Sequence, residues 1–392
     1  MNLVRRHPIA IALVALLLAT AIHPLPPLVD AVTGSVPGDV ELDLPASYVV
    51  LAPLSDTLDA LTFLSLGRAQ WALMVWALAL AAWGAARPAP LRLRVGRALV
   101  GPVAILALAA ATVLLPRPVP RLVAADSAAT ILDYHAHTEA SHDGRSGWTA
   151  ARLAAWHARQ GFEASYVTDH NVIFDSSVVE PIRLLPGVEW SVYRQHVVAL
   201  GPVQPIQRDS FGGSTPRMLR LFAELERQGA SSIASLPEYW QNHRDDLDAF
   251  VAAGVDGFEI VNCAPKGLAF PPAARREVLA LAARHDLLTV GASDNHGWGQ
   301  VTCVWNVSRP GEHGYHANSV YARPLALLQG EWRPWTAPLT QPWFLLRSLG
   351  WSERVSWLTW VVLVLLYRAM PRRQGQPAGI GILARSLGPR AP

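Results

Sequence analysis

Thr130-Ile-Leu-Asp-Tyr-His-Ala-His-Thr138 is a short apolar run that ends in two histidines one residue apart. A run of this length is typical of a buried strand. Residues i and i+2 of an extended chain point to the same face, so His135 and His137 can both reach one metal ion. Ser-His-Asp-Gly follows at 141–144 and brings Asp143 within reach of a neighbouring ion. The stretch therefore predicts a strand with metal-binding groups at its carboxyl end.

Short apolar runs followed by polar residues recur along the next 160 or so residues of the sequence. We expect strands at 130–134, 164–168, 197–200, 232–235, 257–261 and 287–290, and helices at 149–159, 216–228, 244–253 and 272–285. Strands that alternate with helices predict a parallel α/β arrangement, either a barrel or a doubly wound sheet. In a barrel, functional groups gather at the carboxyl ends of the strands. Polar residues fall at those positions: Asp169 and His170, Glu259 and Asn262, and Asp294 and His296.

Imidazoles and carboxylates form an ordered series along this region. After the first cluster come Thr-Asp-His-Asn (168–171), Pro-Gly-Val-Glu-Trp (186–190), His196 and Gly-Ala-Ser-Asp-Asn-His-Gly (291–297). Imidazole together with carboxylate suits Zn, Mn or Fe. A single pair of histidines is a weak indication, but the whole series rarely arises by chance. The series predicts a metal centre.

The series resembles the PHP (polymerase and histidinol phosphatase) domain family, whose motifs run HxHT…SxDG, TDHN, G[IV]E, a histidine-bearing strand, HP and SDxH. The resemblance covers about residues 125–310 of the 392. It implies a distorted (β/α)7 barrel, here flanked by transmembrane helices, with two or three divalent metal ions (Zn, Mn or Fe) at the strand ends. Carried over by motif, the ligands would be His135, His137, Glu189 and Asp294 for the first ion, Asp143, His170 and His296 for the second, and Glu189 with His196 for a third.

One motif departs from the family pattern. The HP step aligns with Ala-Ser-Leu-Pro-Glu-Tyr-Trp at 234–240, so Leu236 stands where a histidine ligand of the third ion is expected. Leucine cannot bind a metal. The third site is therefore empty, or weak, or completed by a nearby group such as His243. We expect two ions.

A centre of this kind suits hydrolysis of a small-molecule phosphate ester. Two ions about 3.5–4 Å apart can activate water at neutral pH and polarise a phosphoryl oxygen. Asp133 and Asp169 adjoin ligand histidines and are candidates to orient them, with strand-end capping as the alternative. Lys266 and Arg194 are candidates to hold a substrate phosphate, with a solvated surface role as the alternative. The competing functions are a metal-dependent amide or lactone hydrolase, and an inactive sensor or binding domain, which only Leu236 supports.

The composition points to a membrane protein. The chain is 51% hydrophobic and only 16% charged, against about 25% charged in an average globular protein. Four apolar segments, at 8–22, 69–86, 98–116 and 355–370, are candidates to cross a bilayer. A helix needs about 20 residues to span it. The first could also be a signal peptide, because Ala19-Thr-Ala21 resembles a cleavage site.

The charges of the loops predict one orientation. The loop between the first two segments is acidic, whereas Arg87, Arg92, Arg94 and Arg97 lie between the second and third. Arg368 lies near the end of the fourth segment, and four more arginines follow it. Basic loops favour the cytoplasmic side. We therefore expect a multi-pass protein of the cell membrane with its enzymatic region outside the cytoplasm.

Four regions follow from these observations. We expect a membrane region at 1–116 with about three transmembrane helices, a metallohydrolase domain at 117–320, a Trp-rich interfacial segment with a last transmembrane helix at 321–370, and a basic cytoplasmic tail at 371–392. A net charge of +3 with a single lysine argues against a nucleic-acid partner. The only two cysteines, Cys263 and Cys303, could pair, but two separate buried thiols are the favoured interpretation.

Overall fold

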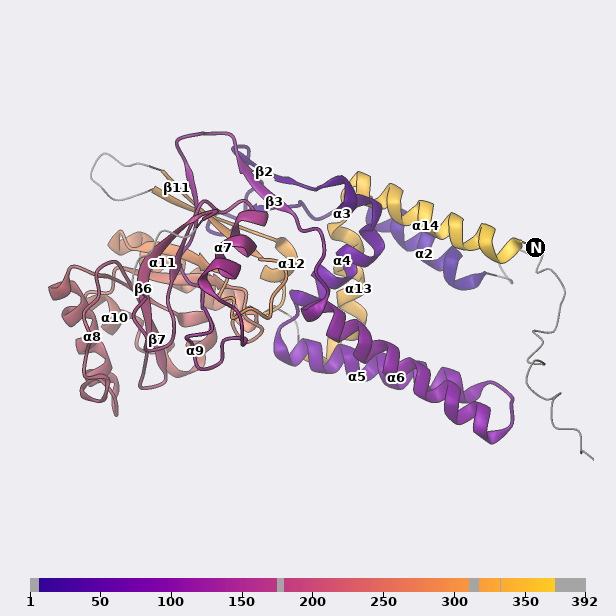
Figure 1. Ribbon diagram of the computed structural model, residues 1–392, viewed down its shortest axis with the longest axis horizontal. Coiled ribbons are helices and arrows are strands. Elements are labelled where there is room, and N and C mark those ends of the chain that lie inside the picture. Colours follow the sequence, from indigo (N-terminus) through magenta and orange to yellow (C-terminus); the bar gives the residue numbers. More distant parts are fainter. Residues whose placement is uncertain (1–6, 175–179, 310–316, 332, 371–392) are drawn as a thin grey trace, which may run out of the picture.

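The computed structural model describes residues 7–174, 180–309, 317–331 and 333–370. The arginines that precede the first apolar segment and the expected tail at 371–392 lie outside these residues. An α/β body occupies one end of the molecule, and long helices extend from it at the other end (Figure 1).

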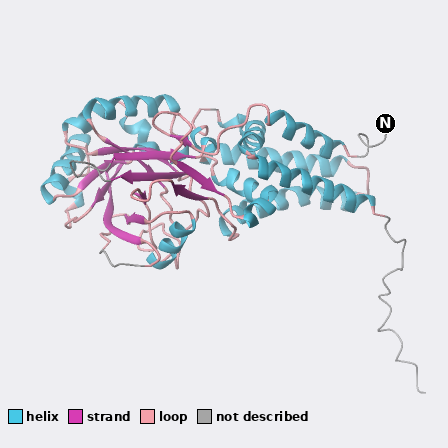
Figure 2. Ribbon diagram, turned by 90° about the horizontal axis from the view of Figure 1, so that it is seen from above, coloured by secondary structure: helices cyan, strands magenta, loops and turns pink. Residues whose placement is uncertain are grey.

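A curled, mixed sheet of ten strands forms the centre of the body in the described residues (Figure 2). In spatial order its strands are β1 (Val29–Asp30), β12 (Ala317–Ala322), β11 (Val304–Arg309), β4 (Thr130–Asp133), β5 (Ala164–Val167), β6 (Arg183–Val192), β7 (Gln195–Leu200), β8 (Ser231–Ala234), β9 (Gly257–Asn262) and β10 (Leu288–Ala292). A separate ribbon pairs β2 (Val40–Asp43) with β3 (Arg121–Ala124). The six strands expected from the sequence are present, with ends shifted by one or two residues.

The expectation of a parallel sheet is correct only in part. Strands β4, β5 and β6 are mutually parallel, as are β8, β9 and β10. Strand β7, however, is antiparallel to both of its neighbours. The reason is a tight hairpin between β6 and β7, in which Tyr193 and Arg194 have positive φ angles of 24° and 60°. Positive φ at both central residues is the backbone conformation that two-residue hairpin turns need.

The sheet curls until the segments that follow β4 and β10 meet. The amide of Asp294 donates to the carbonyl of His135 at 2.9 Å, and the amide of His137 donates to the carbonyl of Asn295 at 3.2 Å. The side-chain amide of Asn306 in β11 adds bonds to the carbonyls of Leu132 and Gly291. Residues about 160 positions apart in the sequence therefore share one end of the sheet.

Amphipathic helices cover the sheet. In α8 (Thr215–Gln228), Met218, Leu221, Phe222 and Leu225 are wholly buried, at the spacing of one helical face. The other helices of the body are α7 (Ala150–Arg159), α9 (Leu236–His243), α10 (Leu247–Ala252), α11 (Pro272–His285) and α12 (Pro324–Leu327), with 3-10 turns at Arg208–Ser210 and Gly267–Ala269. Helices α7, α8 and α11 match the expected ranges closely. The range expected at 244–253 begins with a turn after α9, and within it only α10 is helical.

Within the described residues, α5 (Leu66–Ala86) and α6 (Leu91–Leu114) are the two single helices long and apolar enough to cross a membrane. They form a close antiparallel hairpin at Gly84 and Gly101. A Cβ at either glycine would lie 2.4 Å from an atom of the partner helix. Small residues at such contacts are typical of helix pairs in membranes.

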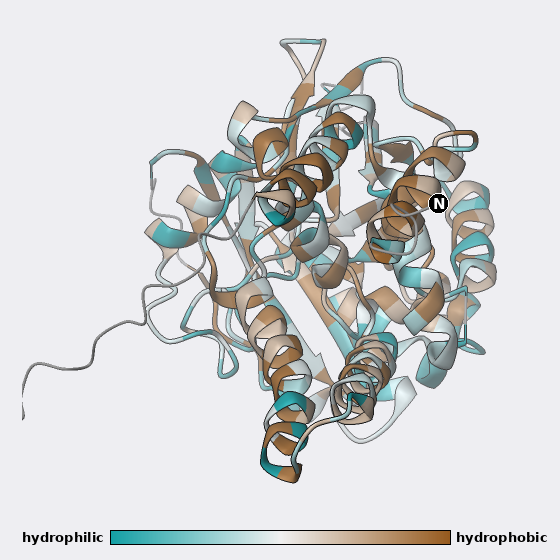
Figure 3. Cartoon of the chain, turned by 90° about the vertical axis from the view of Figure 1, so that its right-hand side faces the viewer, coloured by the Kyte–Doolittle hydropathy of each residue, from teal (hydrophilic) through white to brown (hydrophobic). Residues whose placement is uncertain are grey.

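The remaining helices lie beside this hairpin or link it to the body. They are α2 (Pro8–Thr20), α3 (Ala46–Val50), α4 (Ala52–Thr62), α13 (Ala337–Ser348) and α14 (Trp351–Ala369), with a 3-10 turn at Pro334–Thr336. Helix α14 follows α13 after a bend of 114°, and the bent pair is a further candidate span, whereas α2 is shorter. The α5–α6 connection and the end of α14 both lie at the end of the molecule farthest from the sheet (Figure 1). Apolar residues are frequent along these helices (Figure 3), and many of their large apolar side chains are exposed.

The acidic segment between α2 and α5 packs on the body. Strand β1 pairs with β12, and β2 pairs with β3. The carboxylate of Asp39 accepts a hydrogen bond from the hydroxyl of Tyr321 at 2.8 Å and forms an ion pair with Arg309. The segment before the first long helix is thus on the same side of the molecule as the sheet.

The interpretation of the two cysteines as separate thiols is wrong. Cys263 and Cys303 form a disulfide that links the segment after β9 to the residue before β11. They are 40 residues apart in the sequence, and only the curling of the sheet brings them together.

Candidate metal centre

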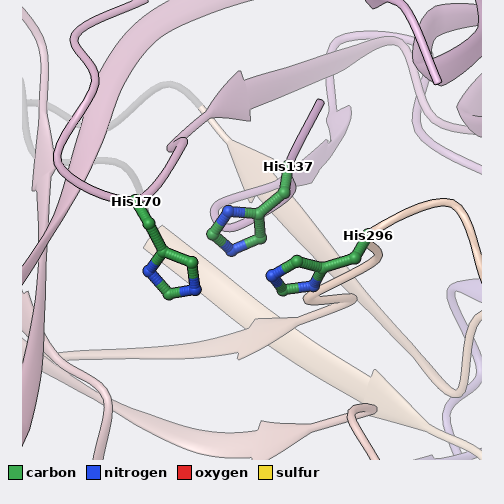
Figure 4. Close-up of side chains that lie close together, drawn as sticks. All are labelled: His137, His170 and His296. Atoms are coloured by element: carbon green, nitrogen blue, oxygen red, sulfur yellow. The ribbon is translucent and has the colours of Figure 1, made fainter. Parts of the chain in front are cut away.

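Histidines from three strand ends converge at the end of the sheet where β4 and β10 meet. Figure 4 shows the rings of His137, His170 and His296 facing one another. The ring centroids of His137 and His296 are 3.9 Å apart, and those of His137 and His170 are 4.7 Å apart. The residues come from the segments after β4, β5 and β10. They converge because functional groups of a barrel gather at the carboxyl ends of its strands.

Four of the expected ligands form a compact cluster, which we call the first cluster: His135, His137, Glu189 and Asp294. All are at least nine-tenths buried. Five separations between their ligand atoms range from 2.9 to 3.7 Å. Two atoms that each bind a tetrahedral zinc ion at 2.0–2.1 Å lie about 3.3 Å apart. The first cluster therefore has the dimensions of a metal site.

Hydrogen bonds on the outer side of the two imidazoles fix their orientation. Nδ1 of His135 lies 2.5 Å from Oε1 of Glu259, and Nδ1 of His137 lies 2.9 Å from Oγ of Ser141. When Nδ1 donates to these oxygens, the lone pair on Nε2 faces the cluster, as a metal ligand requires. Glu259 in turn accepts from Ser235 and Asn262. The sequence marked Glu259 only as a strand-end polar residue, and its pairing with His135 could not be seen.

A second cluster consists of Asp143, His170 and His296. Oδ2 of Asp143 lies 3.6 Å from Nε2 of His170, and Oδ1 lies 3.2 Å from Nε2 of His296. The side chain of Asp143 is 48% exposed, so this cluster opens toward solvent. The hydroxyl of Ser141 accepts from the amide of His170 at 2.8 Å, which ties the second cluster to the first.

Glu189 lies between the imidazoles of both clusters. Its Oε2 is 3.0 Å from Nδ1 of His170, and its Oε1 is 2.7 Å from Nδ1 of His196. Neither oxygen has a hydrogen bond of good geometry within the part of the chain that the structure describes. A buried carboxylate without donors is costly unless it is paired or coordinates a metal. Its lone pairs, aimed among imidazoles, fit a divalent cation.

The ionisation of these groups also fits metal binding. Burial alone would raise the pKa of Glu189, but the charges of His135 and His196 lower it well below its ordinary value. Burial is likewise outweighed at Asp294, where His135 and His137 lower the pKa. At His296, Asp143 and Asp294 outweigh burial and raise the pKa to about 9, so this imidazole must release its proton when a metal ion binds. The carboxylates are ionised at neutral pH, as metal ligands must be.

At the position expected for a third ion, the residues near His196 differ from the family pattern. Leu236 is wholly buried in the main apolar core. The polar group that reaches His196 belongs to Tyr239, whose hydroxyl lies 2.9 Å from Nε2 of that histidine. Both ring nitrogens of His196 thus have partners. Tyr239 could not be predicted from the sequence, because its contact with His196 depends on the direction of α9.

The suggestion that His243 completes a third site is wrong. Its Nδ1 lies 3.0 Å from Oδ2 of Asp246, and its Nε2 lies 3.0 Å from the carbonyl of Arg194. Both ring nitrogens of His243 therefore have hydrogen-bond partners that lie outside the clusters. Arg194, suggested as a phosphate-binding group, meets His243 through its backbone carbonyl.

Asp133 and Asp169 hold the backbone around the clusters. Asp133 accepts from the amides of His135 and Ser293 and lies 2.8 Å from Nε2 of His157. Asp169 accepts from both the amide and the hydroxyl of Thr138. Neither carboxylate binds the imidazole of an expected ligand. They stabilise the segments that carry these ligands, which is close to the capping alternative.

Lys266 does not reach the clusters in the structure. Its side chain is 68% exposed and forms an ion pair with Glu238 at 2.9 Å. Glu238 belongs to α9, close in sequence to Tyr239.

Comparisons with known proteins give no family assignment. No family model matches the chain, and no curated protein matches it. Among solved structures, the chain is similar to a protein assigned as a metal-dependent phosphoesterase from Bifidobacterium adolescentis, with 18% identity over 52% of this chain and 96% of that chain and a TM-score of 0.33. It is also similar to PsfC from Pseudomonas syringae, with 21% identity over 62% of this chain and 98% of that chain and a TM-score of 0.36.

A third similar structure is that of the lesion-specific endonuclease PfuEndoQ from Pyrococcus furiosus. It has 11% identity over 48% of this chain and 54% of that chain, with a TM-score of 0.33. At such scores, what the chain does must be argued from its own residues.

Proposed function

We propose that this protein is a membrane-anchored, metal-dependent phosphoesterase of the PHP type. The observation that carries the proposal is the first cluster. His135 and His137, Glu189 and Asp294 come from three distant segments of the sequence, yet their ligand atoms lie at metal-site separations. These are the residues that the family's motifs assign to one ion. Motif order and geometry therefore support the same site.

In this proposal, β4 to β10 are the seven strands of the distorted barrel. The hydrogen bonds between the segments after β4 and β10 support its closure, because they join the first and last of these strands. The remaining strands, β11, β12 and β1, extend the sheet outward from β4.

We assign two divalent ions, one to each cluster, with Zn, Mn or Fe as the candidates. When bound, such ions activate water at neutral pH and polarise the phosphoryl oxygen of the ester. Glu259 and Ser141 hold the imidazoles of His135 and His137 in the required orientation. Asp133 and Asp169 hold the backbone that carries them.

Tyr239 would keep His196 away from a third ion. Burial and the charges of Glu238 and Glu189 raise the pKa of Tyr239, so its hydroxyl retains its proton. The hydroxyl then donates to Nε2 of His196, while Nδ1 of His196 lies 2.7 Å from Oε1 of Glu189. The lone pair on Nε2 of His196, which a third ion would need, is then occupied by the hydroxyl of Tyr239.

The membrane part of the proposal is a multi-pass anchor with the body outside the cytoplasm. Four arginines lie in the α5–α6 connection and the first two turns of α6. This connection is at the end of the molecule opposite the sheet (Figure 1), and basic loops favour the cytoplasm. The Cys263–Cys303 disulfide supports the same placement, because disulfides persist in oxidising compartments. Exposed indoles of Trp335, Trp343 and Trp351 near the bend before α14 suit a membrane–water boundary.

Phosphate release from a generic phosphate ester by the purified, metal-loaded protein tests the proposed activity. His135→Ala is the matched inactive variant, because it removes one ligand from the first cluster. Turnover of amide or lactone substrates, with none of phosphate esters, would instead support the alternative hydrolase.

A further inference from the structure

A cavity of about 500 Å³ extends from the second cluster to the membrane hairpin. Asp143, Asp294 and His296 line its polar end. Leu66 and Leu73 of α5, with Ala109 and Val113 of α6, line the other end. Ligand-binding cavities are commonly of this size and mostly apolar, with a few polar groups that fix orientation. Here the polar groups are the expected metal ligands, and the apolar wall belongs to the two helices fit to cross a bilayer.

Hydrogen bonds fix the hairpin to the loops that follow the strands. The side-chain amide of Gln300 donates to the carbonyl of Val113 near the end of α6, at 2.6 Å. The amide of Leu66 at the start of α5 donates to the carbonyl of Pro265 at 2.8 Å. Gln300 lies four residues after His296, and Pro265 follows β9. The body-side ends of both helices are thus attached directly beside the clusters.

Exposed apolar side chains in the cavity wall give it access to lipid. Leu66 is 46% exposed and Trp298 is 49% exposed. An indole at the junction of a body and its membrane helices is typical of the membrane–water boundary. A wholly polar substrate would gain no binding free energy from an apolar wall. An alkyl chain would gain it, because contact with the wall removes apolar surface from water.

We propose that the substrate is a long-chain lipid phosphomonoester that enters from the bilayer. Its phosphate would lie at Asp143, Asp294 and His296 with the bound ions, and its alkyl chain would run along α5 and α6. The inference rests on the proposed phosphoesterase function and specifies its substrate class. In the reaction, water adds to phosphorus, the bond from phosphorus to the ester oxygen breaks, and the lipid alcohol leaves with one proton from water, as inorganic phosphate is released.

Two alkyl phosphates of different length test the inference on the full-length, metal-loaded protein in lipid nanodiscs. Dodecyl phosphate and butyl phosphate share the reacting group and differ by eight methylenes. Each methylene moved from water into an apolar site favours binding roughly fourfold, so we expect kcat/KM to be at least about tenfold higher for dodecyl phosphate, even with partial burial.

A matched pair of substitutions separates cavity binding from simple partition into lipid. Ala109→Trp fills the cavity and should lower the dodecyl-to-butyl ratio of kcat/KM at least about fivefold, since most of the chain contact is lost. Ala110→Trp, on the neighbouring exposed surface of the same helix, should keep the wild-type ratio. If Ala109→Trp fails to fold, Leu66→Gln removes apolar surface at a half-exposed position and should lower the ratio in the same direction.

The outcomes distinguish the inference from the function on which it rests. Equal kcat/KM for both esters, or an unchanged ratio in both Ala109→Trp and Leu66→Gln, would overturn the lipid substrate and leave the phosphoesterase intact. Absence of turnover for both esters by metal-loaded protein would overturn both.

Discussion

Oε1 of Glu259 lies 2.5 Å from Nδ1 of His135, on the side of the ring opposite the first cluster. The pairing holds Nε2 of His135 toward Glu189, His137 and Asp294. A carboxylate in this position fixes the tautomer of a ligand histidine and increases its basicity. Glu259 thus orients a ligand of the first cluster that is 124 residues away in the sequence.

Glu259→Gln should weaken metal binding on the order of 10–100-fold, as is typical when such a supporting partner is lost. The fold should survive, because the amide can still bond to Ser235 and Asn262. Metal competition with a chromogenic chelator measures the affinity. Glu238→Gln is the matched control, since Glu238 pairs only with the exposed Lys266 among the salt bridges of the described residues. Equal affinities in the two variants would contradict the role of Glu259.

Asp133→Ala should destabilise the protein by about 1–3 kcal/mol, because it leaves the buried ring of His157 and two amides without their acceptor. Its activity should fall less than that of His135→Ala, since no expected metal ligand is removed. Chemical denaturation and phosphate release measure the two effects. A metal content as low as that of His135→Ala would show that Asp133 acts in the centre itself.

The strands could be predicted from apolar runs wherever these were uninterrupted. Strand β6 was missed because Pro186 and Gly187 break its pattern, although Glu189 within it was identified by its motif. Strands β11 and β12 were missed because their sequence lies among polar and turn-forming residues.

The candidate site, like the fold, could be predicted from the sequence only in part. The eight expected ligands lie in short motifs within or next to strands, so they could be predicted from the sequence alone. The partners Glu259, Tyr239 and His157 lie on other elements, and their proximity exists only in the folded chain. The disulfide and the cavity against α5 and α6 depend on the same three-dimensional proximity.

Reporter fusions should place the body outside the cytoplasm. Alkaline phosphatase, which is active only outside the cytoplasm, should be active when fused after Gly330 and silent when fused after Arg92, at the start of α6. The reason is the cluster of arginines in the α5–α6 connection and the first two turns of α6. The reverse pattern would overturn the proposed topology.

Cys263 and Cys303 should resist alkylation in intact membranes until a reductant is added, because the two sulfurs are bonded to each other. A maleimide-linked polymer, applied after denaturation with and without prior reduction, reveals the paired state as a shift in gel mobility. Modification of both cysteines in unreduced protein would contradict the disulfide and remove one support for the extracytoplasmic body.

Metal content of the purified full-length protein, measured together with phosphate release, tests the central claim most directly. We expect about two ions per chain, loss of turnover in His135→Ala with a lower metal content, and loss of turnover in the wild type after chelation that returns on addition of Zn, Mn or Fe. A protein that binds no metal, or a His135→Ala variant with wild-type turnover, would contradict the proposed metal centre.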